Sequence, residues 1–169
     1  MDSRAVGRVA LISIHPEYAE AILAGEKRVE FRKKPIAQDV THVILYATKP
    51  IGAVIGAFSV DGQQTGSPDR LWERFSAVSG IDREKFESYF NSHSTGTGIL
   101  IRDVYRSCKH LTLESAVGIK RAPQSFQYLD RDRALSLLEQ IEVNAASKFG
   151  GLARDYLRVN QLELQSIND

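Results

Sequence analysis

Short apolar runs alternate with polar segments along most of the chain, and their spacing predicts a mixed α+β fold. Residues 9–14 form an aliphatic run rich in β-branched residues, which is typical of a buried strand. Pro16 suits the first turn of a helix, and Gly25 is a natural stop at the end of that helix. Four further segments are predicted to be strands: 27–32, 42–48, 51–60 and 99–105.

The later part of the chain predicts helices and a domain boundary. Trp72 and Tyr89 lie at helical spacing with other aromatic residues, and we interpret them as core residues. We assign residues 1–130 to one domain and residues 131–169 to a helical C-terminal extension packed on or near it. Helices are predicted over 68–75, 82–90, 111–117 and 130–141, and an extended or turn-like segment over 123–128.

Composition narrows the possible classes of protein. A length of 169 residues, 43% of them hydrophobic, fits one globular domain with a real core. The formal charge is only +1, which excludes a histone-like polycation, so any contact with nucleic acid must come from local clusters of charge. Cys108 is the single cysteine, which excludes an intramolecular disulfide or a zinc site built from thiolates. We expect a cytoplasmic protein without a membrane segment, metal site or cofactor.

Charged residues concentrate in residues 27–34, just after the first predicted helix. Five of these residues are cations and one, Glu30, is an acid. If the segment is extended, Arg28, Glu30 and Arg32 share one side of the strand, because side chains alternate between its faces. An ion-pair row explains Glu30 without any ligand, and a carboxylate that orients an arginine for a ligand explains it equally well.

Four of the residues in this region form a motif. Gly25, Lys27, Glu30 and Arg32 reproduce the pattern Gly-x-Lys-x-x-Glu-x-Arg. The pattern resembles the signature of the ASCH family (activating signal cointegrator homology), a branch of the PUA-like superfamily. The resemblance covers roughly residues 8–129. Four surrounding segments resemble a subgroup described as PUA-like predicted regulators: 12–19, 46–50, 87–90 and 123–126.

The family resemblance implies a small, mostly antiparallel β-barrel flanked by helices, with a cleft lined by the motif and a role in binding RNA or another nucleic acid. Glycines at 52 and 56 agree with the tight curvature of such a barrel. Lys27 and Arg32 would contact phosphates or a base edge, with Glu30 between them. Residues that could contribute to the rim of the cleft are Arg28, Tyr46, Thr48, Lys49 and His15, with the Tyr46 ring stacking on a base.

Enzymatic alternatives are weaker on the sequence alone. Some members of the family resemble amidohydrolases acting on acetylated cytidine, in which the motif lysine works with a threonine. Here the residue three positions after Lys27 is Glu30, so the threonine hydroxyl that the amidohydrolase reaction uses is absent from this position. Others resemble metal-dependent ribonucleases, and Lys27 and Glu30 would then be the acid and base. We predict a module that binds RNA or a modified base or nucleotide, with a hydrolase or a regulatory protein-interaction module as alternatives and the oligomeric state left open.

Overall fold

Six strands and five α-helices make up the part of the chain that the computed structural model describes, residues 7–143. The mixed α+β class predicted from the sequence is confirmed. A short 3₁₀-helix, η1, follows the second α-helix directly. In chain order the elements are β1 (Arg8–Ile14), α1 (Pro16–Leu23), β2 (Val29–Arg32), β3 (Val40–Ala47), β4 (Ala53–Gly66), α2 (Pro68–Phe75), η1 (Ser76–Val78), α3 (Arg83–Phe90), β5 (Gly96–Leu111), α4 (Leu113–Val117), β6 (Phe126–Leu129) and α5 (Arg131–Val143).

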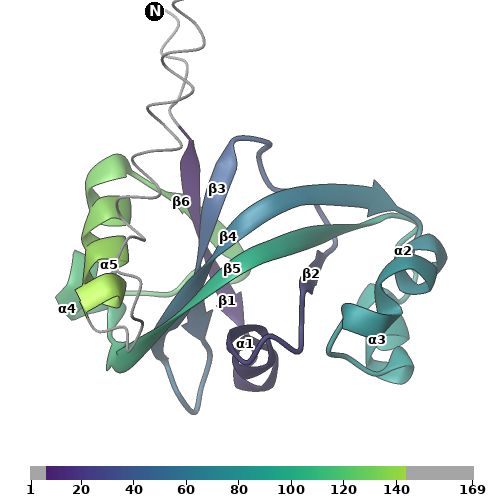
Figure 1. Ribbon diagram of the computed structural model, residues 1–169, viewed down its shortest axis with the longest axis horizontal. Coiled ribbons are helices and arrows are strands. Elements are labelled where there is room, and N and C mark those ends of the chain that lie inside the picture. The colour runs from purple at the N-terminus through teal and green to yellow at the C-terminus, as the bar shows by residue number, and fades with distance from the viewer. Residues whose placement is uncertain (1–6, 144–169) are drawn as a thin grey trace, which may run out of the picture.

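The strands form one sheet in the order β2-β5-β4-β3-β1-β6. Only the β1–β3 pair is parallel, so the sheet is mostly antiparallel, as predicted. In Figure 1, β4 and β5 are long, strongly curved strands that run from the side of α4 and α5 to the side of α2 and α3. The predicted closed barrel is not confirmed. Within the described residues, the ladder of backbone hydrogen bonds ends at β2 on one side and at β6 on the other.

The curvature brings backbones close together at Gly56. A Cβ atom there would clash with the carbonyl oxygen of Tyr105 on β5, and it would also lie 2.8 Å from the Leu23 side chain of α1. Irregularities in the β4–β5 register between Val54 and Gln63 accompany the bend. The glycine at 56 therefore allows the close approach of β4 to β5 and α1 at this bend.

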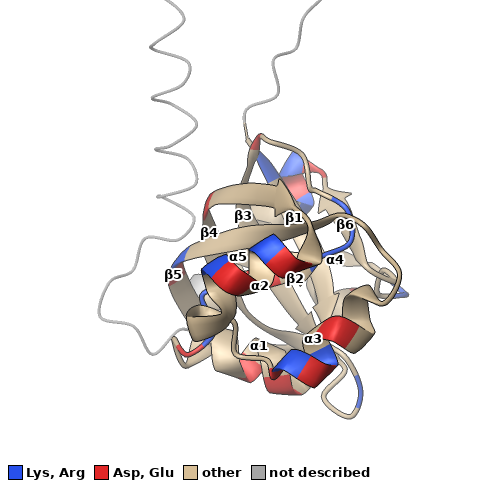
Figure 2. Cartoon of the chain, turned by 90° about the vertical axis from the view of Figure 1, so that its right-hand side faces the viewer, with Lys and Arg blue, Asp and Glu red and all other residues tan. Residues whose placement is uncertain are grey.

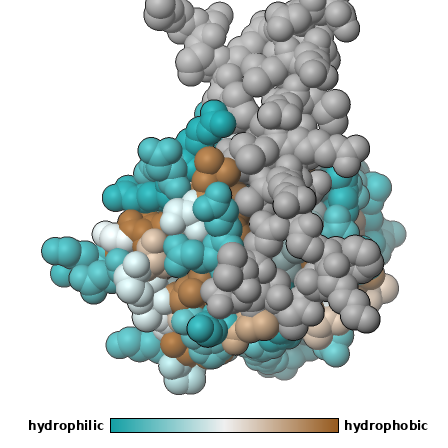
Figure 3. All heavy atoms as spheres, turned by 60° about the vertical axis from the view of Figure 1, so that its left-hand side comes forward, coloured by the Kyte–Doolittle hydropathy of each residue, from teal (hydrophilic) through white to brown (hydrophobic). Residues whose placement is uncertain are grey.

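Helices cover both faces of the sheet and one of its ends. The α1 helix buries Ile22 against one face, together with Ile12 and Phe58. The α4 and α5 helices cover the opposite face, where Leu137 and Leu138 are fully buried. A third cluster joins β2 to α2 and α3, and its buried members are Val29, Phe31, Leu71, Phe75, Phe86 and Phe90. In Figure 3, which brings forward the side that carries α4 and α5, apolar and polar side chains are interspersed over the described surface.

Two strands extend beyond their predicted bounds. The strand predicted over 51–60 continues as β4 to Gly66, and the strand predicted over 99–105 is β5, which starts at Gly96 and ends at Leu111. These polar segments are strands because they pair with each other, as at Thr65 and Thr97, whose hydroxyls lie 3.1 Å apart. A polar side chain is tolerated in a strand when backbone pairing and one exposed face satisfy it.

The boundary predicted at residue 131 stays a prediction. The α5 helix packs on β1, β4 and β5 through buried side chains, whereas residues 144–169 lie outside the described part of the chain. Among the described helices, none is long and apolar enough to cross a membrane.

Candidate functional site

The end of α1 determines where Lys27 lies. Gly25 adopts a positive φ of 81°, which side chains with a Cβ rarely adopt. Its N–H donates to the Ile22 carbonyl and the Glu26 N–H donates to the Ala21 carbonyl, each at 3.0 Å. These two bonds are those of a Schellman motif, which satisfies the last carbonyls of a helix. The glycine of the motif therefore turns the chain out of α1 and into the segment that carries Lys27.

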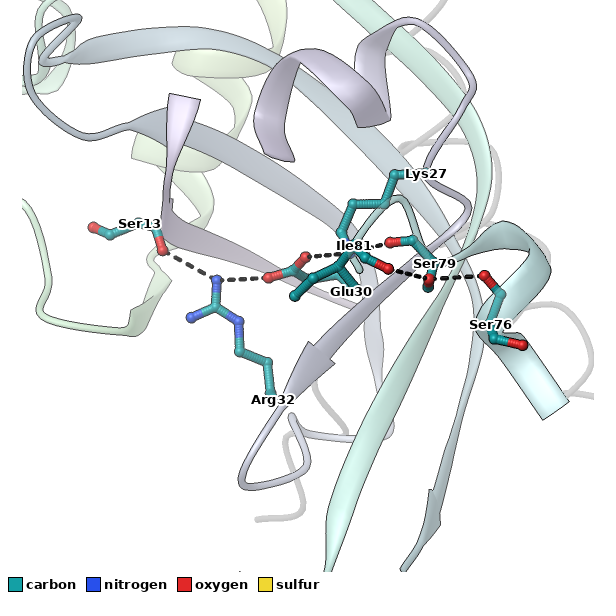
Figure 4. Close-up of polar contacts among 7 residues, drawn as sticks. All are labelled: Ser13, Lys27, Glu30, Arg32, Ser76, Ser79 and Ile81. Carbon is teal, nitrogen blue, oxygen red and sulfur yellow. Dashed lines mark hydrogen bonds and ion pairs between the residues drawn. The ribbon is translucent and has the colours of Figure 1, made fainter. Parts of the chain in front are cut away.

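Lys27, Glu30 and Arg32 form a buried row of charges (Figure 4). Glu30 lies between the two cations, with its Oε2 3.7 Å from Lys27 Nζ and its Oε1 3.1 Å from Arg32 Nη2. The three residues are only 2%, 7% and 9% exposed, so water screens these ion pairs weakly. Glu30 pairs with Lys27 and Arg32, whereas Arg28, predicted to share its face, has an exposed side chain. We call the three residues the buried charge row.

Arg32 links the two ends of the open sheet. From β2, its Nη2 donates to the Ser13 carbonyl of β1 at 3.0 Å, and its Nη1 donates to Ser125 Oγ, just before β6, at 3.2 Å. Its Nε is buried and has no hydrogen-bond partner among the described residues. Side-chain bonds from Arg32 therefore connect edges of the sheet that backbone hydrogen bonds leave unconnected.

A loop from the middle of the chain holds the other end of the row. Lys27 Nζ donates to the Ser79 carbonyl at 2.6 Å, and its ammonium lies 5.4 Å from the Tyr18 ring centroid and 5.3 Å from that of Phe31. Burial lowers the pKa of Lys27, while the neighbouring Glu30 carboxylate opposes this shift. A Cβ at Gly80, whose φ is +59°, would lie 2.7 Å from Lys27 Cβ. Gly80 therefore leaves the space that the lysine occupies.

Two adjoining cavities open on the Lys27 side of the row. The inner cavity has a volume of about 60 Å³, and Lys27 and Glu30 form part of its wall. The outer cavity, about 480 Å³, lies between α1 and α3. Tyr18 and Tyr89 line both, and burial raises the pKa of each phenol. The other lining residues are Phe31, Ile81 and Phe86 in the inner cavity, and Asp82, Glu84, Lys85 and Ser88 in the outer one.

The predicted rim residues do not all meet at these cavities. His15 is exposed just before α1, and its ring centroid lies 6.3 Å from that of Tyr18. Tyr46 is half-buried and packs with the cluster under α4 and α5, on the face of the sheet opposite α1. Thr48 donates its N–H to the Ile14 carbonyl, and Lys49 is exposed in the following turn. None of these four residues lines the two cavities beside Lys27.

Tyr46 and Thr48 are linked to β1, the strand to which Arg32 also binds. Ser13, whose carbonyl accepts from Arg32, is the register partner of Tyr46 in the β1–β3 pair. The candidate residues are thus divided between two places that the buried charge row connects. Lys27 and Glu30 line the inner cavity, while Arg32 donates to Ser13 near the carboxyl end of β1 and to Ser125 before β6.

Sequence reasoning missed several contributors to the site. Tyr89 was interpreted as a core residue but is 37% exposed, unlike its buried neighbours Phe86 and Phe90. The sequence did indicate this exposure, because Tyr89 is a tyrosine among phenylalanines and its hydroxyl favours a position near water. Ser79 and Gly80 carried no such signal, since their contact with Lys27 depends on the fold. Among the described residues, no group of three or more His, Cys, Asp or Glu side chains could hold a metal ion.

Comparison with known proteins confirms the resemblance to the ASCH family. The sequence model of the ASCH domain family matches residues 12–125. An ASCH domain-containing ribonuclease of Zymomonas mobilis is 30% identical over 140 residues, which cover 79% of this chain and 94% of that protein. Crystal structures of ASCH from Zymomonas mobilis and of a serine-to-alanine mutant superpose with TM-scores of 0.70 and 0.71. Both are 28% identical and cover 78% of this chain and 94% of theirs. The chain therefore belongs to the ASCH domain family.

Proposed function

We propose that this protein binds single-stranded RNA on the side of the molecule where the two cavities open. The observation that carries the proposal is the pair of cavities lined by Tyr18 and Tyr89, with the buried Lys27 and Glu30 at their inner end. Single strands are bound by aromatic rings that stack on unpaired bases and by cations that attract the backbone. The ribonuclease name of the Zymomonas relative supports RNA as the ligand.

Exposed cations beside the cavities supply the electrostatic part of the binding. Lys33 and Lys34 follow β2 and are exposed, and Lys33 Nζ lies 5.2 Å from the Tyr89 ring centroid. Arg28, the residue before β2, is also exposed and lines neither cavity. These side chains are free to move toward phosphates, whereas Lys27 and Arg32 are held by internal bonds. The buried cations then act mainly by shaping the site.

Cleavage of RNA is the second candidate function, and the relative's name together with the Lys27–Glu30 pair favours it. Cleavage without a metal needs one group that accepts a proton from the attacking oxygen and another that donates a proton to the leaving oxygen. An ammonium whose pKa burial lowers and a carboxylate beside it can serve as this acid and base. The hydrolysis of an acylated nucleoside, by contrast, stays a prediction from the family resemblance alone.

The binding proposal is tested by titrating labelled single-stranded RNA at two salt concentrations. We expect wild-type affinity to fall steeply with salt and Tyr89→Ala to weaken binding by about tenfold, the loss of one stacked base. Tyr128→Ala is the matched control, because Tyr128 is 39% exposed and Tyr89 37%, and Tyr128 lies on β6 at the other end of the sheet. Equal affinities of wild type, Tyr89→Ala and Tyr128→Ala for the RNA would contradict the proposal.

Cleavage is tested on the same RNA by gel electrophoresis, with chelator and with added magnesium or manganese. If the site is a ribonuclease, the wild-type protein should cut RNA and the Lys27→Met and Glu30→Gln variants should not. Lys120→Met is the control that should keep its activity, because Lys120 is exposed after α4 and lines neither cavity. Circular dichroism of each variant checks that it folds. Fragments that appear equally with wild type and both site variants would point to a contaminating nuclease.

A further inference from the structure

We propose that the two cavities form a subsite for one neutral, unpaired RNA base, and that the RNA phosphates stay outside it, along the lysines that follow β2. This inference rests on the proposed binding of RNA. It states which chemical group of the RNA enters the cavities and which does not.

The charge of the outer cavity disfavours phosphate. Asp82 and Glu84 line it, and Lys85, the cation among its described lining residues, pairs with Glu17 at 3.5 Å and with Asp82 at 3.9 Å. Figure 2 shows charged positions of both signs along α2 and α3, so this side of the molecule offers no continuous basic surface on those helices. A phosphate would face two carboxylates, whereas a neutral base carries no charge for them to repel.

The inner cavity also suits a base edge better than a phosphate. Its volume of about 60 Å³ holds only the edge of a ring. Lys27 Nζ donates and Glu30 accepts hydrogen bonds at this end, and the unpaired edge of each RNA base offers both an acceptor and a donor. A phosphate beside Lys27 would instead lie next to the Glu30 carboxylate, 3.7 Å away from Nζ.

Apart from Ser88 in the outer cavity, the remaining lining is apolar or aromatic. Tyr18 and Tyr89 line both cavities, and Phe31 and Phe86 complete the inner one. The outer volume of about 480 Å³ lies in the range of small-molecule sites, which is enough for one base. Lys33 lies over the Tyr89 ring at 5.2 Å, so a cation borders the mouth where the sugar-phosphate chain would leave.

A series of pentanucleotides, each with one abasic position, tests the inference. We expect loss of one particular base to weaken wild-type binding about tenfold and loss of the others to matter less. In Tyr89→Ala the same base removal should make almost no further difference, because the ring that stacks on it is gone. Lys33→Ala should reduce the slope of log affinity against log salt by about one, and Tyr89→Ala should leave that slope as it is.

Two results separate failure of the inference from failure of the proposed function. If wild type binds none of the pentanucleotides, RNA binding itself is wrong. If wild type binds them but no single base matters, the cavities do not hold a base. A second comparison uses Glu84→Gln and, as its control, Glu87→Gln, which removes an exposed acid of α3 that lines neither cavity. Tighter binding and a steeper salt dependence in Glu84→Gln alone would place a phosphate there and overturn the inference.

Discussion

At the scale of single residues, the position of Glu30 between two cations decides the energetics of the site. Lys27 and Arg32 are at most 9% exposed and depend on the Glu30 carboxylate that they share, because each has lost most of its water. Removing Glu30 leaves Lys27 and Arg32 uncompensated. Removing Lys27 leaves the Glu30–Arg32 pair intact at 3.1 Å.

The two variants should therefore differ in stability. We expect Glu30→Gln to lower the free energy of unfolding by about 3–5 kcal/mol, the usual effect of breaking a buried pair. Lys27→Met should lower it by only about 1–2 kcal/mol, for the lost bond to the Ser79 carbonyl. Urea unfolding at neutral pH measures both. A smaller loss of stability in Glu30→Gln than in Lys27→Met would contradict the view that Glu30 compensates both buried cations.

Lysine titration gives a second prediction at this scale. Burial holds the pKa of Lys27 below 10.5, whereas Glu17 and Tyr18 raise the pKa of the exposed Lys85 above 10.5. Between the lowered pKa and 10.5 the unfolded chain binds more protons at Lys27 than the folded one, so this residue makes stability rise with pH across that window. NMR of ¹³C-labelled lysines should show that Lys27 loses its proton at a lower pH than Lys85. The reverse order would mean that Lys27 is hydrated.

At the scale of elements, two turns hold Lys27 from opposite sides. The Schellman turn at Gly25 aims the chain toward the sheet, and the loop between η1 and α3 supplies the Ser79 carbonyl. Ser79 Oγ fixes this loop by donating to the Ser76 carbonyl at 2.9 Å and to the Ile81 carbonyl at 3.2 Å. Two backbone features therefore position Lys27, in addition to its ion pair with the Glu30 side chain.

Gly80 provides the test of that positioning. Gly80→Ala and Gly118→Ala both introduce a Cβ at a positive φ, which is 59° at Gly80 and 71° at Gly118. The Cβ at position 80 would contact Lys27, whereas a Cβ at position 118 would have no atom within 4 Å. We expect Gly118→Ala to lower the free energy of unfolding by about 1–2 kcal/mol through strain alone. Gly80→Ala should cost about 1–3 kcal/mol more and should weaken RNA binding. Equal losses of stability in the two variants would mean that the loop at Gly80 shifts to make room for the Cβ without moving Lys27.

At the scale of the whole molecule, the sheet separates the α1 face from the face covered by α4 and α5. The α5 helix buries Leu138 completely against β1, β4 and β5, far from the cavities on the α1 side. The helix follows the segment that the family model matches, which ends at residue 125. Its apolar face nevertheless belongs to the core of the sheet.

Substitutions in α5 should affect stability but not RNA binding. We expect Leu138→Ala to lower the free energy of unfolding by about 2–5 kcal/mol, as for a fully buried leucine, and Leu135→Ala, which is only partly buried, to have a smaller effect. Below the unfolding temperature both variants should bind RNA as wild type does. A large loss of affinity in a folded Leu138→Ala protein would show that the two sides are coupled.

Local sequence by itself determined the α+β class, most of the helices and strands, and the charged motif at the end of α1. These features depend on neighbouring residues: apolar spacing, Pro16 at a helix start and Gly25 at a helix end. The polar ends of β4 and β5 were missed because their strand character comes from pairing with each other.

The site itself was decided only by the tertiary structure. Lys27 meets a carbonyl 52 positions away and Arg32 meets a hydroxyl 93 positions away, and no local pattern encodes such contacts. Burial separated the charged run into two sets, because the fold removed water from Lys27, Glu30 and Arg32, which pair with one another, and left Arg28, Lys33 and Lys34 exposed. The sequence named the residues of the motif, and the packing of α1, β2 and the η1–α3 loop determined which of them line a cavity.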